Sequence, residues 1–199
     1  MSGWLDRLLA RLRGGGDLAV LWSVDLETTG LNPRADRIVS VGMVPIRDGV
    51  IRYGERYHSL VRQDGVATEE SEGLRIHEIL PGSAAAAPTE REVLAEVDRR
   101  LGEGALLAHH APLDVAFLRE AYRRHGRPWP RPKVVDTIDL LLEAHRRRHR
   151  FTPHPPPPRT GLADAREALG LPPHDHHDAL ADALAAAELF LALRLTIRT

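Results

Sequence analysis

Two acidic residues, Asp25 and Glu27, stand one residue apart just after the apolar run formed by residues 18–22. A short apolar run of this kind is typical of a buried strand, and residues two apart along a strand point to the same face. The two carboxylates are therefore expected to lie side by side, where their repulsion favours a proton on one of them. Magnesium and manganese ions take oxygen ligands and cancel this charge, so the pair predicts a divalent-cation site. For an isolated pair, the alternative is that Asp25 ends the strand and Glu27 lies in solvent.

The length and composition of the chain favour a single α/β domain. With 199 residues, of which 43% are apolar, the chain can form one core of ordinary size. The formal charge of -1 argues against a surface that is basic throughout for binding long duplexes, but it allows a site that grips one strand end. Because the chain has no cysteine, disulfides and thiolate metal sites are excluded.

The N-terminal residues are expected to form an amphipathic leader. Leucines recur at helical spacing over residues 5–12, and three glycines at residues 14–16 then break the pattern. We expect residues 1–16 to pack on the chain's own domain, residues 17–199, with docking to a partner or to a membrane surface as alternatives. Neither a signal peptide nor an apolar run of about 20 residues is visible, so we expect a cytoplasmic protein that does not span a membrane.

The first half of the chain predicts three antiparallel strands. After the strand that carries Asp25, a second strand is expected over residues 37–46, and Asp48-Gly49 indicates a hairpin. The alternation over residues 50–61 predicts a third strand, with Ile51, Tyr53 and Tyr57 on one face.

The second half predicts strands that alternate with helices. Strands are expected at residues 104–109 and 133–137, and helices at residues 88–101, 110–122, 138–145, 161–169 and 178–194. The basic, proline-rich residues 146–159 are expected to form an irregular, mobile surface loop. Together these elements predict an α/β fold whose mixed five-stranded sheet is flanked by helices.

Two further acidic residues lie where they could reach the end of the first strand. Asp114 starts the helix after the strand at residues 104–109, although an acid at this position also serves to stabilise a helix N-terminus. Asp182 lies in a helix rich in Ala and Leu, where a carboxylate needs a partner. Asp178 stands one turn earlier, so from the residues alone either could be a ligand, and Asp178 also suits a helix cap.

Three motifs resemble those of the DEDDh 3′→5′ exonucleases. They are Asp-x-Glu-Thr-Thr-Gly at residues 25–30, His-x-Ala-x-x-Asp at residues 109–114, and His-x-Ala-x-x-Asp-Ala at residues 177–183. This superfamily includes the proofreading epsilon subunit of bacterial DNA polymerase III, oligoribonuclease and ribonuclease T. The resemblance spans about residues 18–193 and implies a ribonuclease H-like fold. The chain departs from the family at His110 and Leu113, where Asn and Phe are common.

The resemblance also implies a set of site residues and a reaction. The metal ligands fall on Asp25, Glu27, Asp114 and Asp182, the general base on His177, and the substrate contacts on Thr28, Glu72 and His77. The implied cofactors are two Mg²⁺ or Mn²⁺ ions, which assist attack by water while His177 takes its proton. The implied substrates are single-stranded or frayed 3′ ends, with DNA favoured over RNA, and the products are nucleoside 5′-monophosphates. A DNA polymerase is the implied protein partner.

Other functions remain as alternatives. The cluster His174, His176 and His177 could hold zinc, which favours imidazole and carboxylate ligands at catalytic sites. The same fold could also serve as a catalytically silent nucleic-acid-binding or interaction module. An exoribonuclease, or an enzyme that hydrolyses a small phosphodiester with the same metals, would use the same acidic residues.

Overall fold

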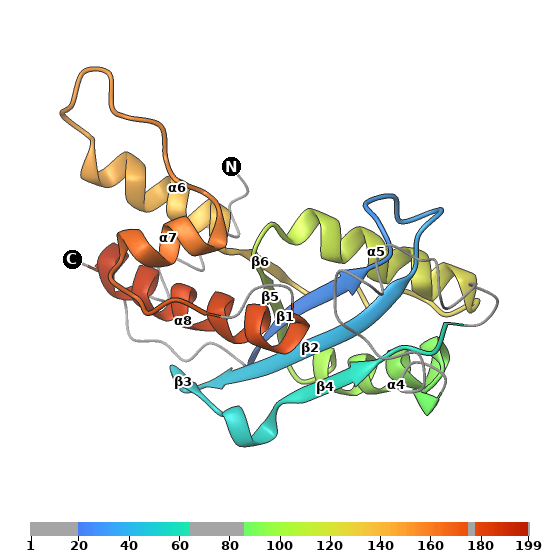
Figure 1. Ribbon diagram of the computed structural model, residues 1–199. Helices are drawn as coiled ribbons and strands as arrows, with labels where there is room; N and C mark the ends of the chain where they lie inside the picture. The colour runs from blue at the N-terminus through green and yellow to red at the C-terminus, as the bar shows by residue number, and fades with distance from the viewer. Residues whose placement is uncertain (1–19, 64–85, 175–177, 199) are drawn as a thin grey trace.

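A mixed β-sheet with helices on both faces forms the body of the molecule (Figure 1). The structure is a computed structural model and describes residues 20–63, 86–174 and 178–198. The strands are β1 (Leu21–Thr28), β2 (Ile38–Arg47), β3 (Val50–Ile51), β4 (Tyr57–Leu60), β5 (Ala105–Ala108) and β6 (Val134–Asp136). Their order is β3-β2-β1-β5-β6, and β4 also pairs with β2. The predicted leader, residues 1–16, lies outside the described residues.

Strand β1 lies at the centre of the sheet and has a different kind of partner on each side. It pairs antiparallel with β2 along its whole length, and this register sets Asp25 opposite Gly42. On the other side it pairs in parallel with β5, but only from Leu21 to Ser23. Beyond Ser23 the two parallel strands are no longer paired, so the second half of β1 borders an opening in the sheet.

The predicted third strand is interrupted, and the prediction of one continuous strand over residues 50–61 was wrong. A short 3-10 helix, η1 (Tyr53–Glu55), separates β3 from β4. The interruption lies opposite Pro45 of β2, which has no N–H to donate to a neighbouring strand, and whose carbonyl accepts from the N–H of Arg52 at 2.9 Å. Because β3 and β4 lie along the same side of β2, the sheet has six strands in five positions, one strand more than the five predicted.

The interruption also changes which side chains share a face. Ile51 packs with the core beneath α8, Tyr57 packs with the core on the opposite face, and Tyr53 is exposed. The prediction that these three side chains lie on one face was therefore wrong. A strand pattern read from the sequence keeps its alternation only while the strand is continuous.

Five helices among the described residues cover the sheet. They are α4 (Glu90–Leu101), α5 (Ala111–Arg124), α6 (Thr137–Arg148), α7 (Leu162–Ala168) and α8 (Ala179–Arg198). The start of α4 is fixed by a capping box, in which Thr89 and Glu92 exchange hydrogen bonds with each other's backbone N–H. Helix α6 continues to Arg148, so the first three residues of the predicted loop at 146–159 are helical.

Two cores form because successive side chains of β1 point to opposite faces. Trp22 and Val24 pack against α4 and α5, whereas Leu21 packs in the core that includes Phe190 and Leu193 of α8. Burial of such a large apolar side chain contributes about 1.5–3 kcal/mol, so each helix layer is held mainly by these contacts. The same alternation directs Asp25 and Glu27 toward the face that α8 covers. None of the helices in the described parts of the chain has the length and apolar character that a membrane span requires.

Candidate active site

Three carboxylates from two distant parts of the chain meet at the end of β1. Oxygen atoms of Asp25, Glu27 and Asp182 all lie within 4.8 Å of one another. The first two stand on β1, and Asp182 comes from the first turn of α8. We call these three residues the acidic cluster. The expectation that Asp25 and Glu27 lie side by side is confirmed.

Asp114 borders the acidic cluster from the helix on the other side of the opening. Its side chain is buried in the first turn of α5, and its carboxylate accepts from the backbone N–H of Leu26, next to Asp25. Burial raises the pKa of Asp114, the N–H groups of Asp114 itself and of Leu26 lower it, and the charges of Asp136 and Glu27 raise it. Asp114 thus takes the place in which a continued β5 would pair with β1.

The turn that aims Asp114 depends on Asp136, which the sequence analysis did not single out. The carboxylate of Asp136 accepts from the N–H groups of His110 and Ala111, at 3.0 Å each, and caps α6 through Ile138. His110 adopts a left-handed conformation with φ 64°, and α5 starts at the next residue. An Asp between a strand and a helix is a recognisable cap signal, but its second role at α5 is visible only in three dimensions.

The pKa of Asp25 is raised well above its ordinary value of 3.8. The largest cause is burial, followed by the negative charges of Asp114, Asp182, Glu27 and Asp178. The charges of four other acidic side chains therefore act on the carboxylate of Asp25, and all of them raise its pKa.

Gly42 allows the start of α8 to lie directly against the sheet beside Asp25. A methyl group at this position would overlap the carbonyl group of Ala179 and the N–H of Leu180, in the first turn of α8. Any other residue would push this turn, and with it Asp182, away from β1. The sequence does carry a signal, since a glycine inside a strand rich in Val and Ile often marks a close backbone approach.

The two acids at the start of α8 have different roles. Asp178 accepts from the N–H of Ala181 at 2.8 Å and caps the helix, so the cap prediction is confirmed. Asp182 belongs to the acidic cluster, and its Oδ1 lies 2.8 Å from Nε2 of His174. The His174 side chain is 9% exposed, so this contact is shielded from solvent.

A buried arginine holds the segment that carries His174. Arg166 of α7 donates to the carbonyl oxygens of Ala185 in α8 and Pro172, at 2.8 and 2.9 Å, and pairs with Glu188 at 2.7 Å. One guanidinium thereby joins α7, α8 and the chain before His174. A charge this deeply buried is tolerated because its hydrogen bonds and its ion pair compensate for lost hydration.

Thr28, the expected substrate contact at the end of β1, lies beside the turn into β2. Its hydroxyl donates to the carbonyl oxygen of Gly30 at 2.7 Å, and the pairing of β1 with β2 shifts register between Glu27 and Thr28. The other two expected substrate contacts, Glu72 and His77, lie outside the described residues. The expected base His177 and His176 of the zinc alternative lie there too.

The donor set of the acidic cluster fits divalent cations. Carboxylate oxygens are the ligands that Mg²⁺ and Mn²⁺ prefer, and three of them lie within reach of one ion here. Burial and the charges of the neighbouring acids both raise the pKa of Asp25, and a bound divalent cation would favour its charged form. Residues that could hold metal are thus Asp25, Glu27 and Asp182, with Asp114 as the acid that borders them.

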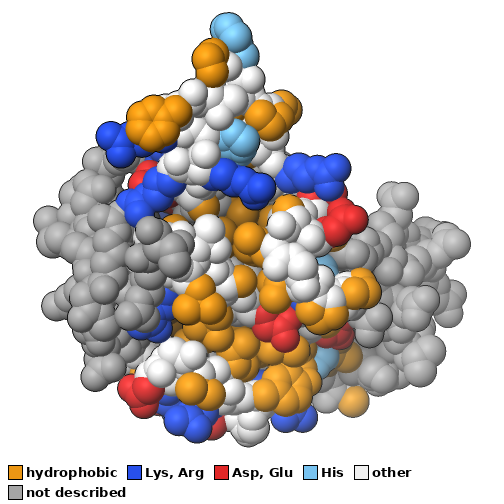
Figure 2. All heavy atoms as spheres, turned by 90° about the vertical axis from the view of Figure 1, so that its left-hand side faces the viewer, with side chains coloured by type: hydrophobic (Ala, Val, Ile, Leu, Met, Phe, Trp, Pro, Cys, Tyr) orange, Lys and Arg blue, Asp and Glu red, His pale blue; other side chains and the backbone are white. Residues whose placement is uncertain are grey.

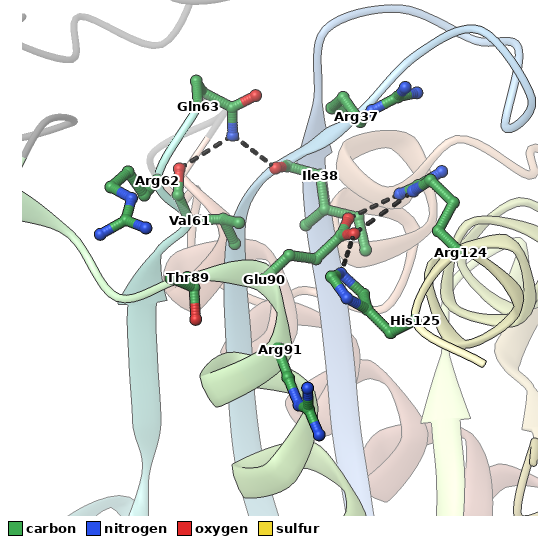
Figure 3. Close-up of a pocket in the computed structure, with 10 residues that line it drawn as sticks. All are labelled: Arg37, Ile38, Val61, Arg62, Gln63, Thr89, Glu90, Arg91, Arg124 and His125. Carbon is green, nitrogen blue, oxygen red and sulfur yellow. Dashed lines mark hydrogen bonds and ion pairs between the residues drawn. The ribbon is translucent and has the colours of Figure 1, made fainter. Parts of the chain in front are cut away.

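A cavity of about 410 Å³ on the opposite face of the sheet has another character (Figure 3). It lies between the start of α4 and the end of α5, and Arg37, Arg62 and Arg91 contribute to its lining. At its wall the carboxylate of Glu90 accepts from Arg124 at 2.6 Å and lies 2.9 Å from the ring of His125. We call this trio the Glu90 network. None of the acidic cluster lines this cavity, so its size does not mark the candidate site.

Comparison with protein families and curated proteins identifies relatives of this chain. The model of the family described as "RNase_T: Exonuclease" matches residues 23–190. A DNA polymerase III PolC-type protein of Thermotoga petrophila is 33% identical over 171 residues, which cover 84% of this chain and 11% of that protein. A DNA polymerase III subunit epsilon-like protein of Rhodobacter capsulatus is 34% identical over 180 residues, 85% of this chain and 23% of that protein. The chain thus spans about a tenth to a quarter of these relatives.

Solved structures share the fold. Exonuclease I of E. coli in complex with a 5cy-dT13 oligonucleotide has a TM-score of 0.70 and 18% sequence identity, over 89% of this chain and 41% of that one. Exonuclease I from Methylocaldum szegediense has a TM-score of 0.70 and 22% identity, over 89% of this chain and 40% of that one. The predicted mixed α/β fold of the ribonuclease H-like kind is therefore confirmed.

Proposed function

Because the chain belongs to the exonuclease family whose model matches residues 23–190, we propose that it hydrolyses nucleic-acid strands stepwise from the 3′ end. The observation that carries this proposal is the acidic cluster, in which residues 25, 27 and 182 meet within 4.8 Å. Asp114, the remaining acid of the family's motifs, borders the cluster and contributes to the raised pKa of Asp25.

The four acids would hold two Mg²⁺ or Mn²⁺ ions. The charges of four other acids act on Asp25, so Asp25 would be the central ligand of these ions. When bound, such a pair of ions supplies Lewis-acid activation of the attacking water and stabilisation of the leaving oxygen. Asp114 and Asp182 lie on separate helices, so the ligands are oriented by the packing of α5 and α8 on the sheet.

The proposed reaction is an in-line displacement at the last phosphodiester. Water attacks the phosphorus atom, the bond from phosphorus to the 3′ oxygen of the preceding nucleotide breaks, and that oxygen takes up a proton. His177 accepts the proton that the water loses, as the resemblance implies, because an imidazole with a pKa near 6.5 can do so at neutral pH. The product is a nucleoside 5′-monophosphate, and Thr28, Glu72 and His77 are proposed to contact the terminal nucleotide.

We infer that single-stranded DNA is the preferred substrate. The exonuclease I structures that share this fold include complexes with dT13 and dA16 oligonucleotides, which supports DNA. RNA is distinguished from DNA by contacts to the 2′ hydroxyl, so it is the matched competitor to test. Several relatives are named DNA polymerase III PolC-type, and a polymerase is accordingly the protein partner to test first.

The test is digestion of 5′-labelled 20-mers of DNA and RNA with added Mg²⁺ or Mn²⁺. We expect a ladder of products shortened from the 3′ end, faster for DNA, and no products after chelation of the metal. Binding without shortening would indicate the silent module, and neither binding nor shortening would indicate another substrate. Either result would overturn the proposal.

A His177→Ala variant tests the base. We expect the rate at neutral pH to fall by about a hundredfold or more, since general-base catalysis contributes roughly 10²–10⁴-fold. Metal and DNA binding, measured by calorimetry and fluorescence anisotropy, should remain. An unchanged rate would remove His177 from this role.

A further inference from the structure

A basic arm, residues 146–160, projects from the body of the molecule between α6 and α7 (Figure 1). It consists of the last turn of α6 and the irregular chain that follows as far as Thr160. Four prolines at residues 155–158 restrict its far half to extended conformations and deprive it of backbone donors. An arm of this kind cannot fold back to make a core of its own.

The charge of the arm is entirely positive. It contains five arginines, at residues 146, 147, 148, 150 and 159, and has no Asp or Glu. This contrasts with the formal charge of -1 for the whole chain. Figure 2 shows basic side chains gathered where the arm leaves the body. Arg146 and Arg147 pair with Glu143 of α6 at 2.8 Å and Arg159 pairs with Glu167 of α7 at 3.3 Å, and the positive charge that remains favours an anionic partner.

An aromatic side chain lies at the exposed part of the arm. Phe151 is 88% exposed, and the guanidinium of Arg150 lies 5.2 Å from its ring centre. A ring this exposed is accessible for stacking against a base. A cation beside an exposed ring is the combination that binds single-stranded nucleic acids, where bases stack on rings and phosphates meet cations.

The two ends of the arm are fixed to the body, one of them beside the acidic cluster. At the α6 end, Arg147 donates to the carbonyl oxygen of Ile197 in α8 at 3.0 Å. At the other end, the backbone of Thr160 is hydrogen-bonded to His109, whose pKa is lowered, mainly by burial, while this bond and the charges of Asp136 and Asp182 act in the opposite direction. The arm is therefore fixed to α8 at its first residues and to the edge of the candidate site at its last residue.

We propose that the basic arm binds the single strand on the 5′ side of the nucleotides held at the acidic cluster. The proposal rests on the proposed function, since it assumes that a 3′ end occupies that cluster. A strand leaving the cluster must run along the adjoining surface, and the arm offers it cations and one exposed ring. A protein groove that takes proline-rich segments is the alternative occupant.

The length of the arm determines how long a strand must be to contact Phe151. Nine residues separate Phe151 from Thr160, and an extended chain of this length spans at most about 30 Å. A stacked strand rises about 3.4 Å per nucleotide, so Phe151 lies within roughly nine nucleotides of the 3′ end. Because the arm is proposed to bind nucleotides on the 5′ side of those held at the acidic cluster, a dinucleotide offers it none, whereas a 20-mer extends past this limit.

The test compares the full-length chain with an Arg150→Ala/Phe151→Ala variant on dT2 and dT20. We expect KM for dT20 to rise about tenfold with kcat unchanged, and both constants for dT2 to stay the same. In EDTA, fluorescence anisotropy should show a similar loss of dT20 affinity. The slope of log affinity against log salt should shrink by about 0.7, the value for one phosphate contact in a single strand.

The matched control is a Tyr53→Ala/Arg56→Ala variant. This pair likewise stacks a guanidinium on an exposed ring, at 4.4 Å, but it lies on η1 at the outer edge of the sheet. Its removal should leave dT20 binding unchanged. Unchanged dT20 affinity in the arm variant, or an equal loss for dT2 and dT20, would overturn the proposal. If the wild-type chain cleaves neither substrate, the proposed function fails, and loss of dT20 binding in EDTA still decides whether the arm binds the strand.

Discussion

The acidic cluster and the Glu90 network differ in how their charges are balanced. In the Glu90 network one carboxylate is shared by Arg124 and His125, and the side chains of Glu90 and Arg124 are largely buried while that of His125 lies nearer the surface. In the acidic cluster, by contrast, burial and the negative charges of four other acids all raise the pKa of Asp25. Both sites lie at the carboxyl end of β1, on opposite faces of the same sheet.

This difference indicates that the Glu90 network stabilises the fold and that the acidic cluster serves a ligand or a reaction. A shared carboxylate stabilises the junction of α4 with α5 without needing anything from solution. Clustered like charges destabilise the free protein, and groups with strongly shifted pKa values gather at functional sites. Changing either site, or the contact of Gly42 with α8 that brings the acidic cluster together, tests this difference.

The largest effect is expected for Asp25→Asn. Loss of the central ligand should lower kcat by about a thousandfold or more, because metal-ion catalysis supplies several kcal/mol. Since one negative charge is removed, the metal-free variant should be more stable than wild type, by about 1 kcal/mol or about 3 °C in Tm. Calorimetry in EDTA and a gel-based nuclease assay measure the two effects. Asp48→Asn, in the exposed hairpin turn, is the control that should change neither; full activity of Asp25→Asn would refute the role of the cluster.

The next largest effect is expected for Gly42→Ala. The added methyl group must push the first turn of α8 away from β2, and a displacement of about 1 Å at a catalytic group can cost about a hundredfold in rate. We also expect a loss of about 1–3 kcal/mol in stability from overpacking. Gly54→Ala is the control, because a methyl group there has no neighbour within 4 Å. Equal kinetics for the two variants would show that Gly42 does not position Asp182.

A smaller effect is expected in the response of Tm to metal and pH. Asp25 and Asp114 have folded-state pKa values above the ordinary 3.8, so their protonation stabilises the fold at low pH, and this contribution is lost as pH rises through the raised values. Divalent cations take the place of these protons, so the rise in Tm on adding Mg²⁺ or Mn²⁺ should grow over the same range. At a hundredfold excess over Kd we expect about 8 °C near neutral pH. A rise that is the same at pH 5 and pH 8 would contradict this account.

The smallest effect on catalysis is expected for Glu90→Gln. The change leaves Arg124 and His125 without their carboxylate and should cost about 2 kcal/mol, or about 6 °C in Tm. The turnover number should stay within about twofold, because the network lies on the face of the sheet away from the acidic cluster. Glu55→Gln, which breaks an exposed ion pair with Arg47, should cost less than about 1 kcal/mol. A large loss of kcat in Glu90→Gln would mean that the two sites are coupled.

The sequence predicted local features well where the cause is local. The helix predicted at residues 88–101 is present as α4, with Val93, Leu94 and Val97 buried, because its capping box and its apolar spacing act within a few residues. The pair Asp25 and Glu27 lies on one face because β1 is continuous through them. The helix-cap role of Asp178 was also predictable, because this cap contacts Ala181, only three residues away.

Features that depend on a partner across the sheet were not predictable in this way. The break between β3 and β4 is set by Pro45 of the neighbouring strand, and no pattern within residues 50–61 reports it. The contact of His174 with Asp182 joins two residues that are eight apart and belong to different elements. The convergence of the acids was inferred from a family resemblance, and only the packing of α8 over Gly42 gives it a physical cause.

The chain order of the acidic cluster has a consequence for protein synthesis. Two members stand near the start of the chain and the third stands on α8, the last helix described. A ribosome delivers the N-terminal part first, so β1 and its neighbours can fold around a half-built set of ligands while α8 is still in the exit tunnel. The nascent polypeptide would then lack a complete acidic cluster until α8 has left the tunnel and docked on the sheet.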